Sequence, residues 1–388
     1  MKRIPPLALA CLLAATPSYA QLGGLTKKLE QAQKVADQAK KLTDLHISEK
    51  EERAIGETIS EKLRTAFGVY QDPAVTKYVS LVGTVLAQSS SRPGLNWQFI
   101  VLDTDGVNAY AAPGGIVHVT RGLLGLVKNE AELAGALAHE ITHITEKHTI
   151  NAIQKSSTLE LASNEIGDSG LTAAAIAKIG EVGFYRVFEN RFDRGDEMEA
   201  DKVGVRVANK VGYNPAGLSA VLQKLADRNK DEKEPNGLFA SHPQLSERIA
   251  AIGKLIKDEK LGSTASVDTR YSKTITFTVV PTTAIAMVDR GARGLAGSSA
   301  KAEPAKDGKA ADDKKTEEKK AEAPKKSGLG LGGLTLTKGS QSQNSQNVAS
   351  AGARGIRPDR DAKGGDNPRI VRVTLTASEI DAFKKGIA

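Results

Sequence analysis

The feature that most constrains the fold is a helical pattern over residues 129–149 that carries two histidines. Apolar residues recur through it at steps of three and four, namely Leu133, Ala134, Leu137, Ala138, Ile141 and Ile144. Asn129 followed by Glu132 is typical of a helix N-cap with a capping-box partner. Positions i and i+4 share one face of a helix, so His139 and His143 would lie one turn apart. We therefore expect a buried helix with both imidazoles on one side.

Residues 139–143 read His-Glu-Ile-Thr-His. Two imidazoles one turn apart can hold one Zn²⁺, and Glu140 beside them can act as general base for an activated water. The simpler alternative is a surface helix with two incidental histidines. A solvent-facing helix would not need the small residues that precede His139, so the pattern favours a metal site.

A catalytic zinc needs three protein ligands and one open position. In the short-spacer arrangement the third histidine follows six residues after His143, where this chain has a threonine. The best remaining candidate is Glu197, on a helix predicted over 195–211. Asp201 lies one turn further, where it could accept a hydrogen bond from a liganding histidine, whereas Glu199 is expected at the surface. The alternative is that Glu197 belongs only to a charged helix face.

Several motifs in the same order resemble one known family. They are HEITH (139–143), EMEAD (197–201), NAYAAPGG (108–115), TRGLL (120–124), GYNP (212–215) and SHP (241–243) with Arg248. Over residues 48–252 the chain resembles the HtpX and CaaX-prenyl-protease type of zinc metallopeptidase, and in particular its soluble, periplasmic BepA-like branch. That branch carries tetratricopeptide repeats after the peptidase domain, and no 34-residue repeat occurs here.

The resemblance implies an α+β fold, a mainly helical zincin-type (gluzincin) peptidase domain with a small β-sheet. It implies one Zn²⁺ per chain, held by His139, His143 and Glu197, with Glu140 as the catalytic base.

The resemblance also implies Asp201 as a carboxylate behind the ligands. His242 is the other catalytic residue that it implies, either stabilising the oxyanion or occupying the open metal position in a latent state. The remaining histidines, His46, His118 and His148, are expected to be structural or exposed.

The chain divides by composition. Residues 1–20 read as a signal peptide, with the only cysteine, Cys11, inside it. Residues 21–47 read as an amphipathic helix or linker, and 48–260 as the peptidase domain. A strand-containing extension (261–292), a disordered basic segment (293–366) and a short strand and helix (367–388) follow.

Periodicity predicts further elements within these parts. Helices are expected over 49–67, 73–90, 216–228 and 377–385, and strands over 97–102, 116–120, 274–280 and 369–375. The last two strands could pair with each other. The weakly patterned stretch 155–183 is expected to form a lid or plug, and residues 111–120 could present a strand edge to an extended peptide.

The charge distribution bears on partners. The formal net charge is +8, but residues 293–388 hold 19 Lys and Arg against 12 Asp and Glu, while the rest holds 35 against 34. The globular part is therefore near neutral, and nucleic acid is not expected as a partner. The basic tail could contact an anionic envelope surface, which would associate the protein with the outer membrane.

The sequence therefore predicts a periplasmic zinc endopeptidase that acts on misfolded or unassembled exported proteins. The alternative, from another class, is a latent or chaperone-like assembly factor with a capped zinc site.

Overall fold

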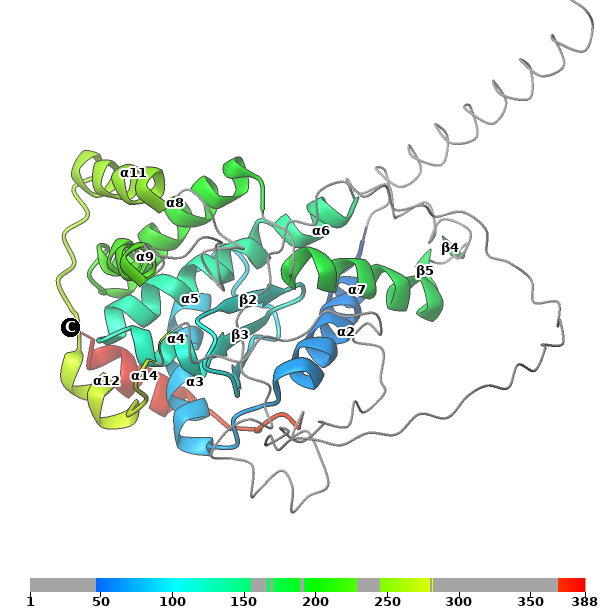
Figure 1. Cartoon of the computed structure of the whole chain (residues 1–388), viewed down its shortest axis with the longest axis horizontal. Coiled ribbons are helices and arrows are strands. Elements are labelled where there is room, and N and C mark those ends of the chain that lie inside the picture. Colours follow the sequence, from blue (N-terminus) through cyan, green and yellow to red (C-terminus); the bar gives the residue numbers. More distant parts are fainter. Residues whose placement is uncertain are drawn as a thin grey trace, which may run out of the picture.

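The computed structural model describes residues 47–154, 166–167, 170–188, 192–228, 245–279, 281 and 369–387. The predicted signal peptide, most of the predicted N-terminal helix and the basic segment 293–366 lie outside these residues. Within the described part, helices surround a small three-stranded sheet (Figure 1). The predicted mainly helical α+β fold is confirmed.

The sheet is formed by β1 (Gln98–Leu102), β2 (Ala109–Ala112) and β3 (Ile116–Thr120). Its order is β1-β3-β2, with β1 parallel and β2 antiparallel to β3. The predicted strands at 97–102 and 116–120 are confirmed. The sequence analysis missed β2, because all four residues of Ala-Tyr-Ala-Ala are buried and no polar alternation marks them.

Of the predicted strand edge over residues 111–120, Ala111 and Ala112 lie on β2, an edge strand of the sheet, whereas residues 116–120 form the central strand. β3 lies at the centre of the sheet and pairs on both sides. β2 is buried throughout, and the hydroxyl of Thr149 donates to the carbonyl of Ala111 at 3.4 Å. An extended peptide could therefore reach β2 only if the elements packed beside it moved.

Two hydrophobic cores lie on opposite faces of the sheet. Phe99 and Val117 point to the face covered by α3 (Pro73–Ala87) and α5 (Glu130–Thr145). Ile100 and Tyr110 point to the face covered by α2 (Glu49–Phe67) and α7 (Ala173–Phe188). The sheet thus holds α5 in a fixed position, buried on all sides.

The remaining elements follow these in chain order. They are α4 (Arg121–Leu126), α6 (His148–Gln154), β4 (Ile166–Gly167), β5 (Gly170–Leu171), α8 (Arg194–Val211), α9 (Gly217–Arg228), α11 (Leu245–Asp258), α12 (Asp268–Thr274) and α14 (Ala377–Lys385). The helices predicted over 49–67 and 377–385 are confirmed to the residue, and those over 73–90, 195–211 and 216–228 to within a few residues.

Helix α5 begins as predicted but ends early. The side chain of Asn129 accepts from the backbone N–H of Glu132 at 2.9 Å. The Glu132 carboxylate accepts from the N–H of Lys128 at 2.7 Å instead of closing the expected box on Asn129. The helix was predicted to reach residue 149 but stops at Thr145, because Lys147 adopts φ 58° and redirects the chain into α6.

The two predicted C-terminal strands are wrong. Residues 275–279 and 369–375 are extended, but neither belongs to a strand, and they do not pair with each other in the part of the chain that the structure describes. Within residues 275–279, Ile275 is buried, and Phe277 contacts Tyr70, between α2 and α3, edge-on with ring centroids 5.2 Å apart. Alternate burial along an extended segment therefore does not require a ladder.

The predicted lid over residues 155–183 is only partly described. Residues 155–165 lie outside the described part, and 173–183 belong to α7, which packs against α2 and α6. A covering role for residues 155–165 stays a prediction.

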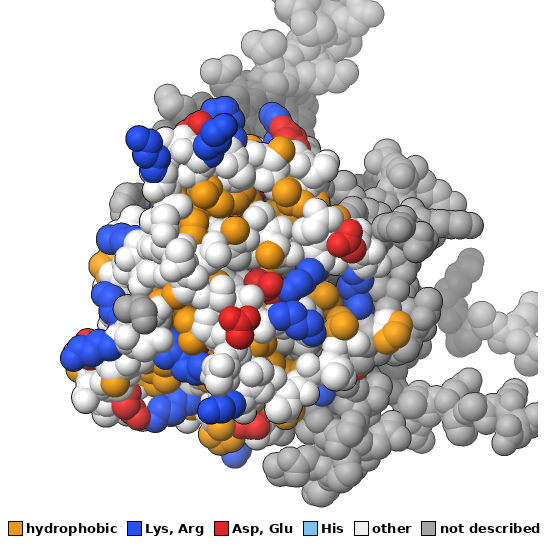
Figure 2. Space-filling model, turned by 90° about the vertical axis from the view of Figure 1, so that its left-hand side faces the viewer, with side chains coloured by type: hydrophobic (Ala, Val, Ile, Leu, Met, Phe, Trp, Pro, Cys, Tyr) orange, Lys and Arg blue, Asp and Glu red, His pale blue; other side chains and the backbone are white. Residues whose placement is uncertain are grey.

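The surface agrees with a near-neutral globular part. Figure 2 shows basic and acidic side chains interspersed with small apolar patches on the face it presents. Among the described helices, none has the length and apolar character needed to cross a bilayer.

Candidate metal centre

Three buried side chains from two helices bring their electron-pair donors together. His139 and His143 lie on α5, and Glu197 lies on the first turns of α8. The two Nε2 atoms are 3.1 Å apart. Glu197 Oε2 lies 3.7 Å from Nε2 of His139, and its Oε1 lies 3.5 Å from Nε2 of His143. Lone pairs that face one another at these distances repel unless a proton or a cation lies among them, so the cluster could hold a metal ion.

Asp201 supports the first histidine from behind. It lies one turn after Glu197, and its Oδ1 is 3.0 Å from Nδ1 of His139. Acceptance by a carboxylate fixes the proton on Nδ1 and leaves Nε2 free to bind a metal. The structure therefore places Asp201 where the sequence analysis expected it.

Arg248 on α11 joins these acidic groups, and the sequence analysis gave it no role. Its guanidinium donates to both oxygens of Asp201, from Nε at 2.7 Å and Nη2 at 2.6 Å, and its Nη1 lies 2.7 Å from Glu197 Oε2. Burial alone would raise the pKa of Asp201, but the hydrogen bonds and charge of Arg248 hold that pKa well below its usual range. Arg248 thereby holds the Asp201 carboxylate ionised and contacts the Glu197 carboxylate as well.

The close approach of α8 to α5 depends on Gly204. A Cβ added at Gly204 would lie 2.9 Å from the backbone nitrogen of His139. Only a residue without a side chain lets the helix that carries Glu197 come this near to the helix that carries the histidines.

Glu140 follows His139 on α5 and is buried. The cavity that both residues line, together with Arg248, has a volume of about 10 Å³. A space of this size accepts about one water molecule and no peptide. This cavity thus leaves room for a water beside Glu140.

His148, which was expected to be structural or exposed, contacts the second histidine of the cluster. It is buried, and its Nδ1 lies 2.9 Å from Nδ1 of His143. The turn at Lys147 brings it there, whereas a continuous helix would not have. Glu199 is exposed as predicted, but its Oε2 lies 3.3 Å from Nε2 of His148. Phe192 stacks on the His143 ring with centroids 4.1 Å apart.

The other histidines take different places. His242 and His46 lie outside the described residues, so the predicted role of His242 stays a prediction. His118 is fully buried on β3, with its Nε2 2.9 Å from the hydroxyl of Ser60, and burial lowers its pKa to about 3. It belongs to the core, as predicted.

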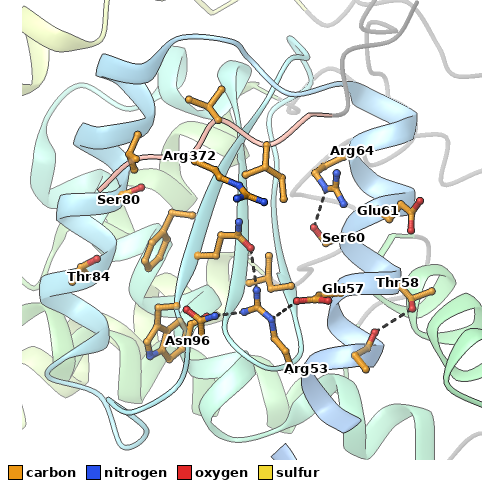
Figure 3. Close-up of a pocket in the computed structure, with 18 of the residues that line it drawn as sticks. Arg53, Glu57, Thr58, Ser60, Glu61, Arg64, Ser80, Thr84, Asn96 and Arg372 are labelled. Atoms are coloured by element: carbon orange, nitrogen blue, oxygen red, sulfur yellow. Dashed lines mark hydrogen bonds and ion pairs between the residues drawn. The ribbon is translucent and has the colours of Figure 1, made fainter. Parts of the chain in front are cut away.

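A wider cavity lies elsewhere in the described residues. It has a volume of about 1160 Å³ and is bounded by α2, α3, β1 and the extended segment 369–375 (Figure 3). Arg53 there donates to the carbonyls of Asn96 and Gly114 and to the side chain of Gln98, which fixes the guanidinium to the cavity wall. The cavity shares no lining residue with the metal cluster, so its size does not mark it as the reactive site.

The sequence of this chain is similar to those of known peptidases. Residues 73–256 match the model of peptidase family M48. The beta-barrel assembly-enhancing protease of Yersinia pestis is 29% identical over 273 residues, which are 66% of this chain and 54% of that protein. The protein of the same name from Escherichia coli (strain K12) is 28% identical over 228 residues, or 55% of this chain and 47% of its own length. The chain therefore spans about half the length of these relatives.

A third relative matches a shorter stretch of the chain. The mitochondrial metalloendopeptidase OMA1 of Arabidopsis thaliana is 28% identical over 171 residues, which are 43% of this chain and 33% of that protein. The matched region contains α5, α8 and α11, the three helices that carry the metal cluster and Arg248. Residues 73–256 of this chain are therefore similar to the peptidase family M48 domain over the helices that carry the cluster.

Proposed function

We propose that this protein is a zinc-dependent endopeptidase that hydrolyses peptide bonds in misfolded or unassembled proteins of the cell envelope. The observation that carries the proposal is the gathering of His139 Nε2, His143 Nε2 and the Glu197 carboxylate within 4.8 Å of one another.

The separations within this cluster favour zinc. Tetrahedral zinc with bonds of about 2.0–2.2 Å separates its ligand atoms by about 3.3–3.6 Å. The closest separations here are 3.1, 3.5 and 3.7 Å. Two imidazoles and one carboxylate also leave a fourth position for water or substrate, as catalytic zinc sites require.

Bound at this cluster, zinc would acidify a water molecule and polarise the scissile carbonyl. Glu140 takes the proton of the attacking water and passes it to the leaving amine. Asp201 holds His139 by its Nδ1–H, and Arg248 holds the Glu197 carboxylate in place. His242, which lies outside the described residues, is proposed to steady the developing oxyanion.

The substrate class rests on the relatives and the leader sequence. Two of the relatives are named for enhancing β-barrel assembly. With the predicted signal peptide, this supports action on unfolded or misassembled polypeptides in the periplasm. Attachment of the basic segment 293–366 to an anionic envelope surface, such as the outer membrane, is a further part of the proposal.

The closed site favours a second candidate, a latent or chaperone-like assembly factor. The cavity beside Glu140 has no room for a peptide. Such a factor would bind unfolded chains without cleaving them, whereas the intact ligand set and Glu140 favour catalysis.

Cleavage of unfolded casein separates the two candidates. The zinc-loaded full chain is expected to cleave it and to stop when o-phenanthroline removes the metal. Glu140→Gln is expected to lower the rate by about 10²–10⁴-fold while retaining zinc, because it removes the proton acceptor alone. Glu146→Gln, at the end of the same helix, serves as the control and keeps full activity. A Glu140→Gln protein that cleaves at the wild-type rate refutes the base assignment, and a wild type that binds casein without cleaving it favours the second candidate.

A further inference from the structure

His148 lies behind the second histidine of the metal cluster, on the side away from the metal position. It opens α6, is 2% exposed, and places its Nδ1 2.9 Å from Nδ1 of His143. The two rings are nearly perpendicular, with 76° between their planes. The contact is therefore a directed one between two ring nitrogens and not a stacking contact.

We propose that His148 and Glu199 form a hydrogen-bond relay that positions His143 for metal binding. The inference rests on the proposed zinc site. Nε2 of His143 faces the cluster, 3.5 Å from Glu197 Oε1, so this nitrogen must offer its lone pair. A neutral imidazole that binds through Nε2 carries its proton on Nδ1, and Nδ1–H of His143 is a donor.

The donor on His143 determines the tautomer of His148. Because the two Nδ1 atoms are in contact, Nδ1 of His148 must accept, and its own proton must lie on Nε2. That Nε2–H points to acidic groups, with Glu199 Oε2 at 3.3 Å and Asp196 Oδ1 at 3.9 Å. Every member of the relay thus has a partner of the correct kind.

The relay returns to the helix that supplies the third ligand. Glu199 and Asp196 flank Glu197 on α8, so the chain of contacts runs from α5 through α6 to α8. His139 is held in a parallel way, by Asp201 at 3.0 Å from its Nδ1. Outer partners of this kind fix the ring orientation of a liganding histidine. His148 is therefore a positioning residue, and Glu199 orients it from the surface.

A merely structural role would make His148 a space-filling core residue. A pair of substitutions distinguishes the two roles. His148→Asn keeps a carbonyl oxygen near the position of Nδ1, and asparagine suits the first turn of a helix. His148→Leu keeps the bulk and removes the acceptor. If His148 only fills space in the core, His148→Leu should lower zinc affinity less than His148→Asn does. If His148 acts in the relay, His148→Asn should lower it less.

The experiment measures zinc affinity of the full chain by competition with a chelating dye. His148→Leu is expected to weaken zinc binding by about 10–100-fold, and His148→Asn by much less. Asp201→Asn, which removes the carboxylate behind His139, gives the reference loss. Glu199→Ala is expected to weaken binding only a few-fold because its side chain is exposed, with Glu181→Ala on α7 as a matched control.

Nuclear magnetic resonance of ¹⁵N-labelled imidazoles tests the relay in the unsubstituted protein. The zinc-bound wild type is expected to carry the His148 proton on Nε2. A proton on Nδ1 of His148, equal zinc affinity in His148→Leu and wild type, or equal losses in the leucine and asparagine variants would each overturn the relay. A wild type that binds no zinc would instead overturn the proposed function itself.

Discussion

Helix α5 contacts a buried carboxylate near each of its ends, Glu130 and Glu197. The neighbours of these two carboxylates differ. Glu130, in the first turn, accepts from the hydroxyls of Tyr78 at 2.7 Å and Tyr213 at 2.6 Å. Arg270 Nε donates to it at 2.7 Å. Burial, together with the charge of Glu130, raises the pKa of both tyrosines, which keeps their hydroxyls protonated as donors. The carboxylate of Glu130 is thus satisfied by protein groups alone.

Glu197, near the other end, faces atoms that also carry lone pairs. Nε2 of His139 and Nε2 of His143 lie 3.7 and 3.5 Å from its oxygens, and Nη1 of Arg248 lies 2.7 Å from its Oε2. Glu130 accepts from three donors, whereas Glu197 lies between a guanidinium and two imidazole nitrogens that can bind a cation. We therefore infer a stabilising role for Glu130 and a metal-binding role for Glu197, although both side chains are almost fully buried.

The largest expected effect on stability comes from Glu130→Gln. The amide presents N–H groups to two hydroxyls and a guanidinium that need an acceptor, and it leaves Arg270 without its charge partner. Breaking a buried pair in this way costs about 3 kcal/mol or more. Urea denaturation of the metal-free protein measures the loss.

The zinc affinity of the same Glu130→Gln protein tests whether the two ends of α5 have separate roles. It is expected to match that of the wild type under conditions where the variant is folded. A variant that lost zinc binding while keeping its helical circular dichroism would show that the two ends of α5 are coupled, and the assignment of separate roles would fail.

A smaller effect is expected from His118, a buried histidine outside the cluster. Its pKa in the folded protein is about 3, against about 6.5 in an unfolded chain. Between these values the unfolded state binds the extra proton, so the free energy of unfolding falls as the pH is lowered from about 6.5 towards 3.

His118→Gln removes this contribution while keeping an acceptor for Ser60. We expect the variant to be less stable at pH 7 and to lose less stability than the wild type between pH 7 and pH 5. Urea denaturation of both proteins without metal at the two pH values measures this difference. Equal losses in the two proteins would contradict a neutral, buried His118.

Local patterns predicted much of the fold and of the site. The spacing of His139 and His143, the Asn129 cap and the helix around Glu197 depend on residues close in sequence, and the structure confirms these elements. The contact of Asp201 with His139 followed from one helical turn and from the family resemblance together.

What could not be predicted depends on packing between segments far apart in the sequence. Arg248 meets Asp201 across 47 positions, and nothing in its own segment marks it as buried. The contact of His148 with His143 was not predicted, because the left-handed turn falls at Lys147, a residue type that gives no sign of it. The extended segments 275–279 and 369–375 alternate like strands, but no strand pairs with them in the described residues.

The most direct test of the central claim is zinc binding by the wild type and by Glu197→Gln, after the metal has been stripped and zinc restored. We expect one zinc per wild-type chain. Glu197→Gln keeps the size of the side chain and is expected to bind zinc roughly 100-fold more weakly or worse, because it removes a charged ligand and not merely an outer partner. Glu181→Gln, an exposed change of the same chemistry on α7, is expected to bind as the wild type does. Equal affinity of Glu197→Gln and wild type, or a wild type that binds no zinc, would contradict the assignment of this cluster as the metal site.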